Sequence, residues 1–285
     1  MDFVWHTMAI IFMTIPHYLG LNLVFGKGKI LHFGPEAVSI VAGYSVFILL
    51  MRVGTGYPVA IIGGLVLVSL ISVFFAWFAL RLDSDAFGVM SIALHLAFVA
   101  VVLNWTSVTR GALGIPGIYR FPFLHTPFEF AMFSLVITTL FILFMLWVDR
   151  SSFGRQLTAL AEHKWHSQSL GINRAYVYII AFLISGVGML ITIVLMRQYH
   201  TIIHPNGFGF HVLIFGVMVV VAGKPGSVLG VTLATALLTL LGEAIRFVPL
   251  APSVLGPVRL ILFGLILFIA VYIRRDTLFP KEREI

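Results

Sequence analysis

Long apolar segments, separated by short polar or glycine-containing stretches, repeat from one end of the chain to the other. A helix needs about 20 apolar residues to cross the hydrocarbon layer of a membrane. Three segments of this length, 58–80, 130–148 and 176–196, hold no charged residue. They predict an all-α integral membrane protein, a polytopic bundle of transmembrane helices.

Further apolar segments raise the expected number of crossings to about nine. The stretch 210–241 is interrupted by Gly-Lys-Pro-Gly at 223–226, which predicts two short passes. Eight or ten crossings stay open, because 36–51 and 210–222 are short enough to form re-entrant or partial helices. The other continuous segments are 3–24, 36–51, 87–103 and 257–273.

The same pattern predicts a single domain. The first apolar segment lacks a basic start and a small-residue cleavage site, so we interpret it as the first crossing and not as a signal peptide. The longest polar segment, 149–174, is too short for a soluble domain. Residues 1–285 are therefore expected to form one transmembrane unit.

Composition narrows the class of protein. The chain is 60% hydrophobic and 10% charged, whereas soluble domains are about 45–50% apolar and about 25% charged. This excludes a soluble enzyme and a disordered protein, and the long unbroken apolar runs exclude an outer-membrane barrel. Because the chain has no cysteine, it has no disulfide, thiolate metal site or cysteine nucleophile.

The positions of the basic residues predict the topology. With segment 149–174 in the cytoplasm, nine crossings place twelve of the 18 Lys and Arg residues inside and six outside, as the positive-inside rule requires. The N-terminus is then outside and the C-terminus cytoplasmic. The same rule accounts for the net charge of +7 without a nucleic-acid partner, for which we find no basic domain.

Motifs of an energy-converting or catalytic site are missing. The sequence holds no phosphate-binding loop, no H-E-x-x-H and no G-x-S-x-G. His163 and His166 are the closest histidine pair on one helical face, and a solvated face explains them better than a metal site. We expect no catalytic residue and no metal, and a chain that acts as a conduit with its energy supplied by other proteins.

Ionisable residues inside apolar segments are functional candidates, because charge in lipid is costly. Glu36 follows Gly34-Pro35 at the start of a crossing, where a carboxylate at a helix N-terminus or a gate are both possible roles. His95 lies in the middle of 87–103, and a hydrogen-bonded core histidine and a pore residue are equally compatible with the sequence.

The segment 153–172, FGRQLTALAEHKWHSQSLGI, has an amphipathic pattern. Leu157, Leu160, Ala161 and Trp165 recur at steps of three and four residues, which predicts a short helix. Gly171 follows as a helix-ending glycine. Such a helix at the cytoplasmic face is either a docking element for another protein or a membrane-surface helix without a partner.

This segment resembles the ATPase-docking loop of ABC importer permeases of the branched-chain amino-acid family, LivH/LivM type and closer to LivM. Segments 26–44, 80–118, 204–210, 219–230 and 272–279 resemble further family motifs in the same order. The departures are His166-Ser167 in place of paired alanines, Lys224-Pro225 after the inner turn, and Glu36 at a usually small or apolar position. The loop residues that match are Phe153, Gly154, Arg155, Leu157, Ala159, Glu162, Leu170, Gly171 and Ile172.

The resemblance implies a permease domain over 1–285, with a docking loop at 149–175, in the plasma (inner) membrane of a prokaryote. Its substrates would be branched-chain amino acids or related small solutes such as amides and urea, moved by alternating access. The implied partners are two ABC ATPase subunits that bind ATP and Mg, a second permease of LivH type, and a periplasmic or extracellular substrate-binding protein. This chain itself would bind no cofactor.

The resemblance also implies roles for single residues. Glu162 and Gly171 would fix the docking helix, next to Gly154 and Arg155. The residues expected to meet the ATPase are Leu160, Ala161, Trp165 and His166. The residues proposed for the translocation path or a gate are Gly34, Glu36, Tyr44, His95 and Asn104.

Two other classes stay in view. A stand-alone secondary transporter or channel would need no ATPase, and it would show ion-coupling residues that the apolar segments lack. An integral-membrane enzyme would need a cluster of His, Asp or Glu at one interface, where the sequence offers only scattered ones.

Overall fold

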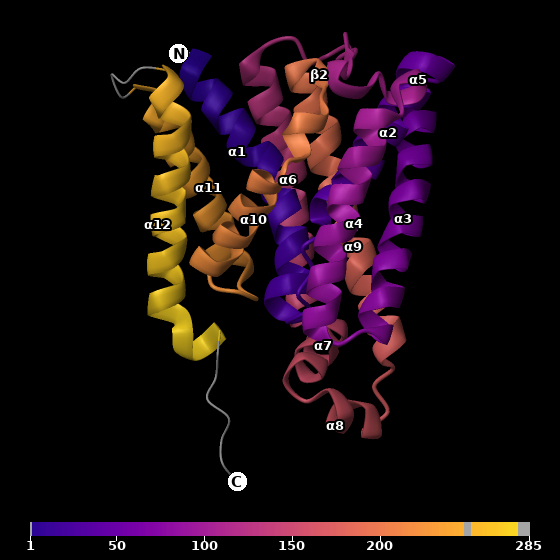
Figure 1. Cartoon of the computed structure of the whole chain (residues 1–285), viewed down its shortest axis with the longest axis vertical. Coiled ribbons are helices and arrows are strands. Elements are labelled where there is room, and N and C mark those ends of the chain that lie inside the picture. Colours follow the sequence, from indigo (N-terminus) through magenta and orange to yellow (C-terminus); the bar gives the residue numbers. More distant parts are fainter. Residues whose placement is uncertain (1, 248–251, 279–285) are drawn as a thin grey trace.

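The computed structural model describes residues 2–247 and 252–278. Within these ranges nine helices are long and apolar enough to cross a membrane, which confirms the predicted fold class and the count of nine. The long helices run side by side (Figure 1). The bounds of the long helices are α1 Asp2–Leu21, α2 Pro35–Ile48, α3 Tyr57–Arg81, α4 Ser84–Asn104, α6 Pro127–Arg150, α9 Arg174–His200, α10 Phe210–Ala222, α11 Val228–Ala244 and α12 Pro252–Leu278.

Short elements connect these helices. α1 and α2 continue into π-helical turns at Asn22–Lys27 and Leu49–Val53. Strands β1 (Ile115–Pro116) and β2 (Ile202–Ile203) pair antiparallel, at the end of the bundle that also holds the N-terminus (Figure 1). The remaining short helices are α5 Thr106–Thr109, α7 Ser152–Glu162 and α8 Lys164–Ser169, with 3-10 turns at Gly111–Leu113, Pro205–Phe208 and Ile245–Phe247.

Helices α1 and α9 form the centre of the bundle. α1 packs against α6, α9 and α11, and α9 packs against α1, α2 and α3. Gly20 and Gly188 allow the close approach, since a Cβ on Gly20 would lie 2.7 Å from the Ser185 carbonyl oxygen and one on Gly188 would lie 2.4 Å from that of Pro16. Small residues at such crossings are typical of membrane helices.

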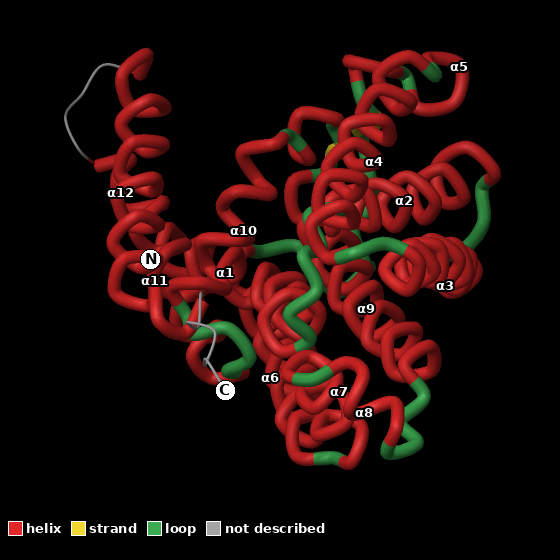
Figure 2. Tube along the Cα trace, turned by 60° about the horizontal axis from the view of Figure 1, so that its bottom comes forward, coloured by secondary structure: helices red, strands yellow, loops and turns green. Residues whose placement is uncertain are grey.

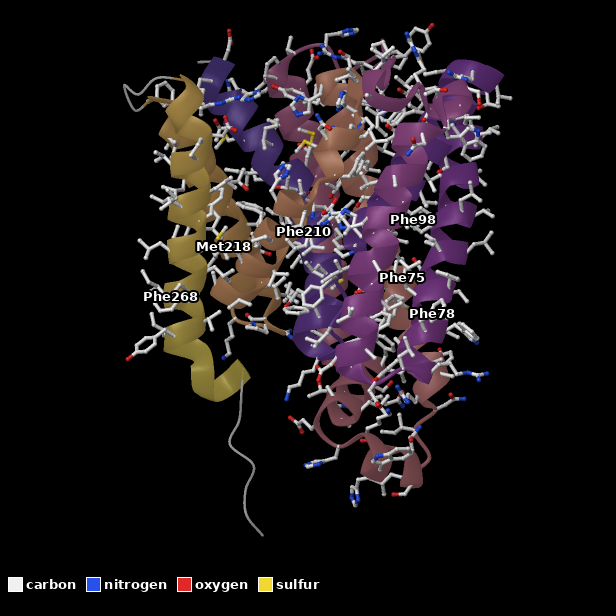
Figure 3. The ribbon with its side chains drawn as sticks, viewed as in Figure 1. Phe75, Phe78, Phe98, Phe210, Met218 and Phe268 are labelled. Atoms are coloured by element: carbon white, nitrogen blue, oxygen red, sulfur yellow. The ribbon has the colours of Figure 1, made fainter. Side chains whose placement is uncertain are left out.

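Several of the outer long helices present apolar side chains outward. Most of α3, α4 and α6 is unburied and apolar, as lipid contact requires. α12 lies at the side of the bundle (Figure 2), where Phe263 packs against Phe215 of α10 with ring centroids 5.0 Å apart. Phe268 on the same helix is 69% exposed and lies away from the bundle (Figure 3).

Helices α2 and α10 both begin inside the bundle after an irregular segment. Before α10, the carbonyl of Phe208 is 2.7 Å from Nε2 of His95, which lies in the middle of α4. Phe210, the first residue of α10, lies near mid-height of the bundle (Figure 3). Glu36 in the first turn of α2 likewise contacts His17 of α1, part-way along a helix that continues through its π-helical turn to Lys27. The two short apolar segments, 36–51 and 210–222, are thus helices that begin part-way through the bundle.

The predicted amphipathic helix is two helices, α7 and α8, with a break at His163. That residue leaves the helical conformation with φ −141° and ψ 82°. Gly171 follows the end of α8 with φ +87°, a left-handed conformation that glycine adopts without strain, which confirms it as a helix-ending glycine. Both helices lie together below the ends of α6 and α9 (Figures 1 and 2).

Candidate functional site

Three ionisable side chains from three helices meet inside the bundle: His17 of α1, Glu36 of α2 and Arg197 of α9. Atoms Nε2 of His17 and Oε1 of Glu36 are 3.2 Å apart. Glu36 is 3% and His17 is 6% exposed, and the charges of Glu36 and the partly buried Arg197 attract each other. We call these three residues the buried charged cluster.

The sequence of α1 places His17 at a proline. Pro16 has no N–H, which frees the carbonyl of Phe12 four residues earlier. The hydroxyl of Thr138 on α6 donates to that carbonyl. The backbone N–H of His17 donates to the Thr192 hydroxyl of α9 at 3.0 Å. Neighbouring helices thus satisfy the interrupted backbone, as membrane helices with proline require, and they fix the height of His17.

A cavity of about 90 Å³ adjoins the buried charged cluster. That is room for about three water molecules. Its wall includes all three cluster residues, Ser39 of α2 and the Gly207-Phe208 segment that precedes α10. The cavity therefore lies where the starts of α2 and α10 meet the central helices.

Several polar atoms around this cavity have no hydrogen-bond partner in the described part of the chain. They are Glu36 Oε1, His17 Nε2 and Arg197 Nε. The 3.2 Å contact between the first two has the distance of an ion pair but lacks hydrogen-bond geometry. Buried polar groups without partners cost free energy, and a ligand that hydrogen-bonds to these atoms would remove that cost.

Gly207 makes room for the guanidinium of Arg197. A Cβ added at Gly207 would lie 2.6 Å from one terminal nitrogen of Arg197. The guanidinium carbon then lies 4.9 Å from the ring centroid of Phe208, at the distance of a cation–π interaction. Gly207 and Phe208 thus hold the Arg197 guanidinium beside the cavity, and we call this position the seat of Arg197.

The residues proposed for a path or gate are only partly brought together. Glu36 lies in the cluster, while His95 and Tyr44 both adjoin Phe208, through the His95 hydrogen bond and a Tyr44–Phe208 ring distance of 6.4 Å. Gly34 instead packs against the Phe75 ring. Asn104 is exposed at the end of α4 and donates to the Ala100 carbonyl.

Two cluster residues were not among the proposed site residues. Arg197 belongs to the last turn of α9 and lies against the cavity. His17 directly follows Pro16 in α1. The signal for both was their place at the edge or interior of an apolar segment, where an ionisable side chain needs a partner.

The second candidate region is the α7–α8 loop. Leu157 and Leu160 are buried in the main core, and Lys27 forms an ion pair with Asp149 that joins the ends of α1 and α6. Leu160, expected to meet a partner, is 2% exposed and so anchors the loop instead. Trp165 is 78% exposed, and Arg155, Glu162 and His166 are also exposed.

A cavity of about 220 Å³ lies between this loop and the bundle. Burial and the positive charge of Arg174 lower the pKa of Lys164, against the attraction of Asp83. The residues that the structure describes include no group of three or more His, Cys, Asp or Glu suited to a metal ion. The charged residues that line this cavity are Lys29, Asp83, Glu162, Lys164 and Arg174.

Comparison with known proteins gives a consistent result. The family model "Branched-chain amino acid transport system / permease component" matches residues 6–271. The high-affinity branched-chain amino acid transport system permease proteins LivM of Salmonella typhimurium and Escherichia coli are 27% and 26% identical over 84% of this chain. The chain spans about 62% of the length of these two relatives.

A solved structure, PsaBC from Streptococcus pneumoniae in complex with Fab, aligns over 95% of this chain and 91% of that chain. The TM-score is 0.49 and the sequence identity 14%. A likeness of this size supports no conclusion about function.

Proposed function

The chain belongs to the permease family of branched-chain amino acid transport systems, and from this premise we propose that it is the membrane-spanning subunit of an ATP-driven ABC importer. It takes up branched-chain amino acids or related small solutes such as amides and urea. A second permease of LivH type stands beside it, and a periplasmic or extracellular binding protein delivers the solute. The importer works in the prokaryotic plasma membrane.

The observation that carries this proposal is the way the α7–α8 loop is built. Its inner side is held in the core by Leu157 and Leu160, while Glu162, Trp165 and His166 are exposed. A rigidly anchored helix pair with an exposed aromatic and charged surface suits a contact with another protein. A push on this surface would move the helices to which it is anchored.

In the proposed mechanism two ATPase subunits bind ATP and Mg, close, and press on the docking loops of two permeases. The permeases then switch between outward-open and inward-open forms. ATP drives this change only if the ATPases bind one form better than the other. The chain itself holds no cofactor in this scheme, and ATP hydrolysis belongs to its partners.

The proposed orientation places the α7–α8 loop in the cytoplasm and the N-terminus outside. Two facts support it. Twelve of 18 basic residues lie on the loop side of a nine-crossing topology. The described N-terminal end of α1 and the α7–α8 loop lie at opposite ends of the bundle (Figure 1).

A pull-down in mild detergent tests the proposal, with this chain tagged and expressed in its own host and mass spectrometry as readout. We expect two ABC ATPases and a second hydrophobic permease. Recovery of this chain alone, stable and monodisperse, would instead indicate a self-sufficient transporter or channel. A Trp165→Ala variant is the matched test of the loop and should lose the ATPases while retaining the second permease.

A further inference from the structure

In the buried charged cluster Glu36 contacts His17 at ion-pair distance but forms no ion pair with Arg197. Glu36 supplies a carboxylate and Arg197 a guanidinium, and the structure records no direct ion pair between the two, although their charges interact. Both line the same cavity of about 90 Å³. A buried pair that served only to stabilise the fold would be expected in direct, fully hydrogen-bonded contact.

The unsatisfied atoms point to a ligand with two charged ends. Glu36 Oε1 accepts no hydrogen bond and Arg197 Nε donates none. Glu36 has only His17 at ion-pair distance, and Arg197 forms no ion pair with any residue that the structure describes. Because charge inside a membrane protein is costly, a cation bound at Glu36 and an anion bound at Arg197 would stabilise both groups. A neutral amide or urea would supply neither charge.

The start of α10 favours the anionic end of such a ligand. Val212 in the first turn of α10 lines the cavity, and the first-turn N–H groups and positive dipole end of a helix favour an anion. The positive end of α2 already faces a carboxylate, that of Glu36 in its own first turn. Broken helices of other transporters present such ends to a substrate carboxylate.

We propose that Glu36 and Arg197 recognise the two ends of a zwitterionic amino acid, with the ammonium group at Glu36 and the carboxylate at Arg197. His17, whose Nε2 lies 3.2 Å from Glu36 Oε1, is a positioning residue for the Glu36 carboxylate. The cavity accommodates the charged end of the amino acid and not its side chain. This inference rests on the proposed function, and it narrows the solute class from amides and urea to amino acids.

Equilibrium binding to the purified complex, without ATP and without the binding protein, tests the proposal. The probes are leucine, leucinamide, which lacks the carboxylate, and 4-methylpentanoate, which lacks the ammonium group. For the unaltered protein we expect leucine to bind at least about tenfold more tightly than either analogue, a difference of about 1.4 kcal/mol.

Each variant of the cluster should lose the selectivity for one of the two charged groups of leucine. With Glu36→Gln, leucine and 4-methylpentanoate should bind equally, and with Arg197→Gln, leucine and leucinamide should. The matched controls are Asp85→Asn and Arg81→Gln, exposed charges outside the cluster, which should retain the original order. A merely structural role would weaken all three ligands together and leave their order unchanged.

Equal binding of the three probes to the unaltered protein, or unchanged selectivity in both cluster variants, would overturn the inference. ATP-dependent uptake of leucine by the same preparation with its binding protein is a separate readout. If uptake needs ATP but the cluster variants keep their selectivity, the proposed function stands and this inference fails. If leucine binds selectively but uptake is independent of ATP, the importer proposal fails and the site stands.

Discussion

The α7–α8 loop and the buried charged cluster both hold charged residues, but their surroundings are opposite. In the loop, Arg155 and Glu162 are exposed, and water solvates them at little cost. In the cluster, Glu36 is 3% exposed and lacks a full set of partners. An exposed charge in the loop costs little free energy, so only the sequence motif around it indicates a function. A charge buried in the bundle costs much free energy, and that cost itself indicates a function.

The largest expected effect is on the loop. Gly171 has φ +87° and donates its N–H to the Gln168 carbonyl at 3.0 Å. Proline fixes φ near −65° and has no N–H, so Gly171→Pro should abolish ATP-driven uptake while membrane insertion stays intact. The measurement is uptake in proteoliposomes, normalised to inserted protein.

Gly171→Asn is the matched control, because asparagine tolerates the left-handed conformation, and it should retain most of the uptake. Glu162→Ala, on the exposed side of the loop, should also abolish uptake. Normal uptake with both Gly171→Pro and Glu162→Ala would remove the loop from the coupling mechanism.

The next effect concerns the seat of Arg197. A valine at Gly207 would occupy the space of the guanidinium, which lies 2.6 Å from the position of an added Cβ. Gly207→Val should lower leucine uptake by about tenfold, as the loss of one charge-assisted hydrogen bond predicts. Gly56→Val is the control, since a Cβ there would approach only Pro58, at 3.7 Å; an equal loss in both would argue against a role of the seat.

A smaller effect on transport, but a clear one on stability, is expected from the anchor of the loop. Leu157 is fully buried, and Leu157→Ala should lower the free energy of unfolding by about 2–5 kcal/mol. Thermal unfolding followed by tryptophan fluorescence measures it. Exposed Leu170 provides the comparison, and Leu170→Ala should leave the unfolding temperature unchanged; destabilisation by both would mean that the loop packs differently.

The smallest effect is expected at His95. Its Nε2 is 2.7 Å from the Phe208 carbonyl and the residue is fully buried, as expected for a core histidine. Because one such hydrogen bond is worth about 1 kcal/mol, His95→Ala should lower uptake by less than about fivefold. A complete loss with assembly unimpaired would place His95 on the translocation path.

Much of the fold could be predicted from the sequence, because each crossing is a local property. The segment 58–80 became α3 (Tyr57–Arg81), and the Gly-Lys-Pro-Gly turn at 223–226 separates α10 from α11. The break at His163 was missed, since no glycine or proline marks it. That α2 and α10 begin inside the bundle could be named only as an alternative. The short length of a segment does not distinguish a helix that crosses part of the membrane from a short helix that crosses all of it.

The candidate site was less predictable, for a physical reason. The loop residues lie within one continuous segment, so a local sequence motif is enough to identify them. The cluster joins residues 17, 36 and 197, and their proximity depends on how α1, α2 and α9 pack. Arg197 follows an apolar segment directly, and only the packing of α9 shows that it turns inward.

Cysteine accessibility would test most directly whether the cluster lies on the translocation path. The chain has no cysteine, so Ser39→Cys introduces a single thiol, on the cavity wall beside His17. It should react with a small water-soluble thiol reagent in one nucleotide state of the importer, be protected in the other, and be shielded by leucine. Ser72→Cys, buried outside this cavity, should never react. A Ser39→Cys thiol that stays unreactive in every state would contradict a path through the cluster.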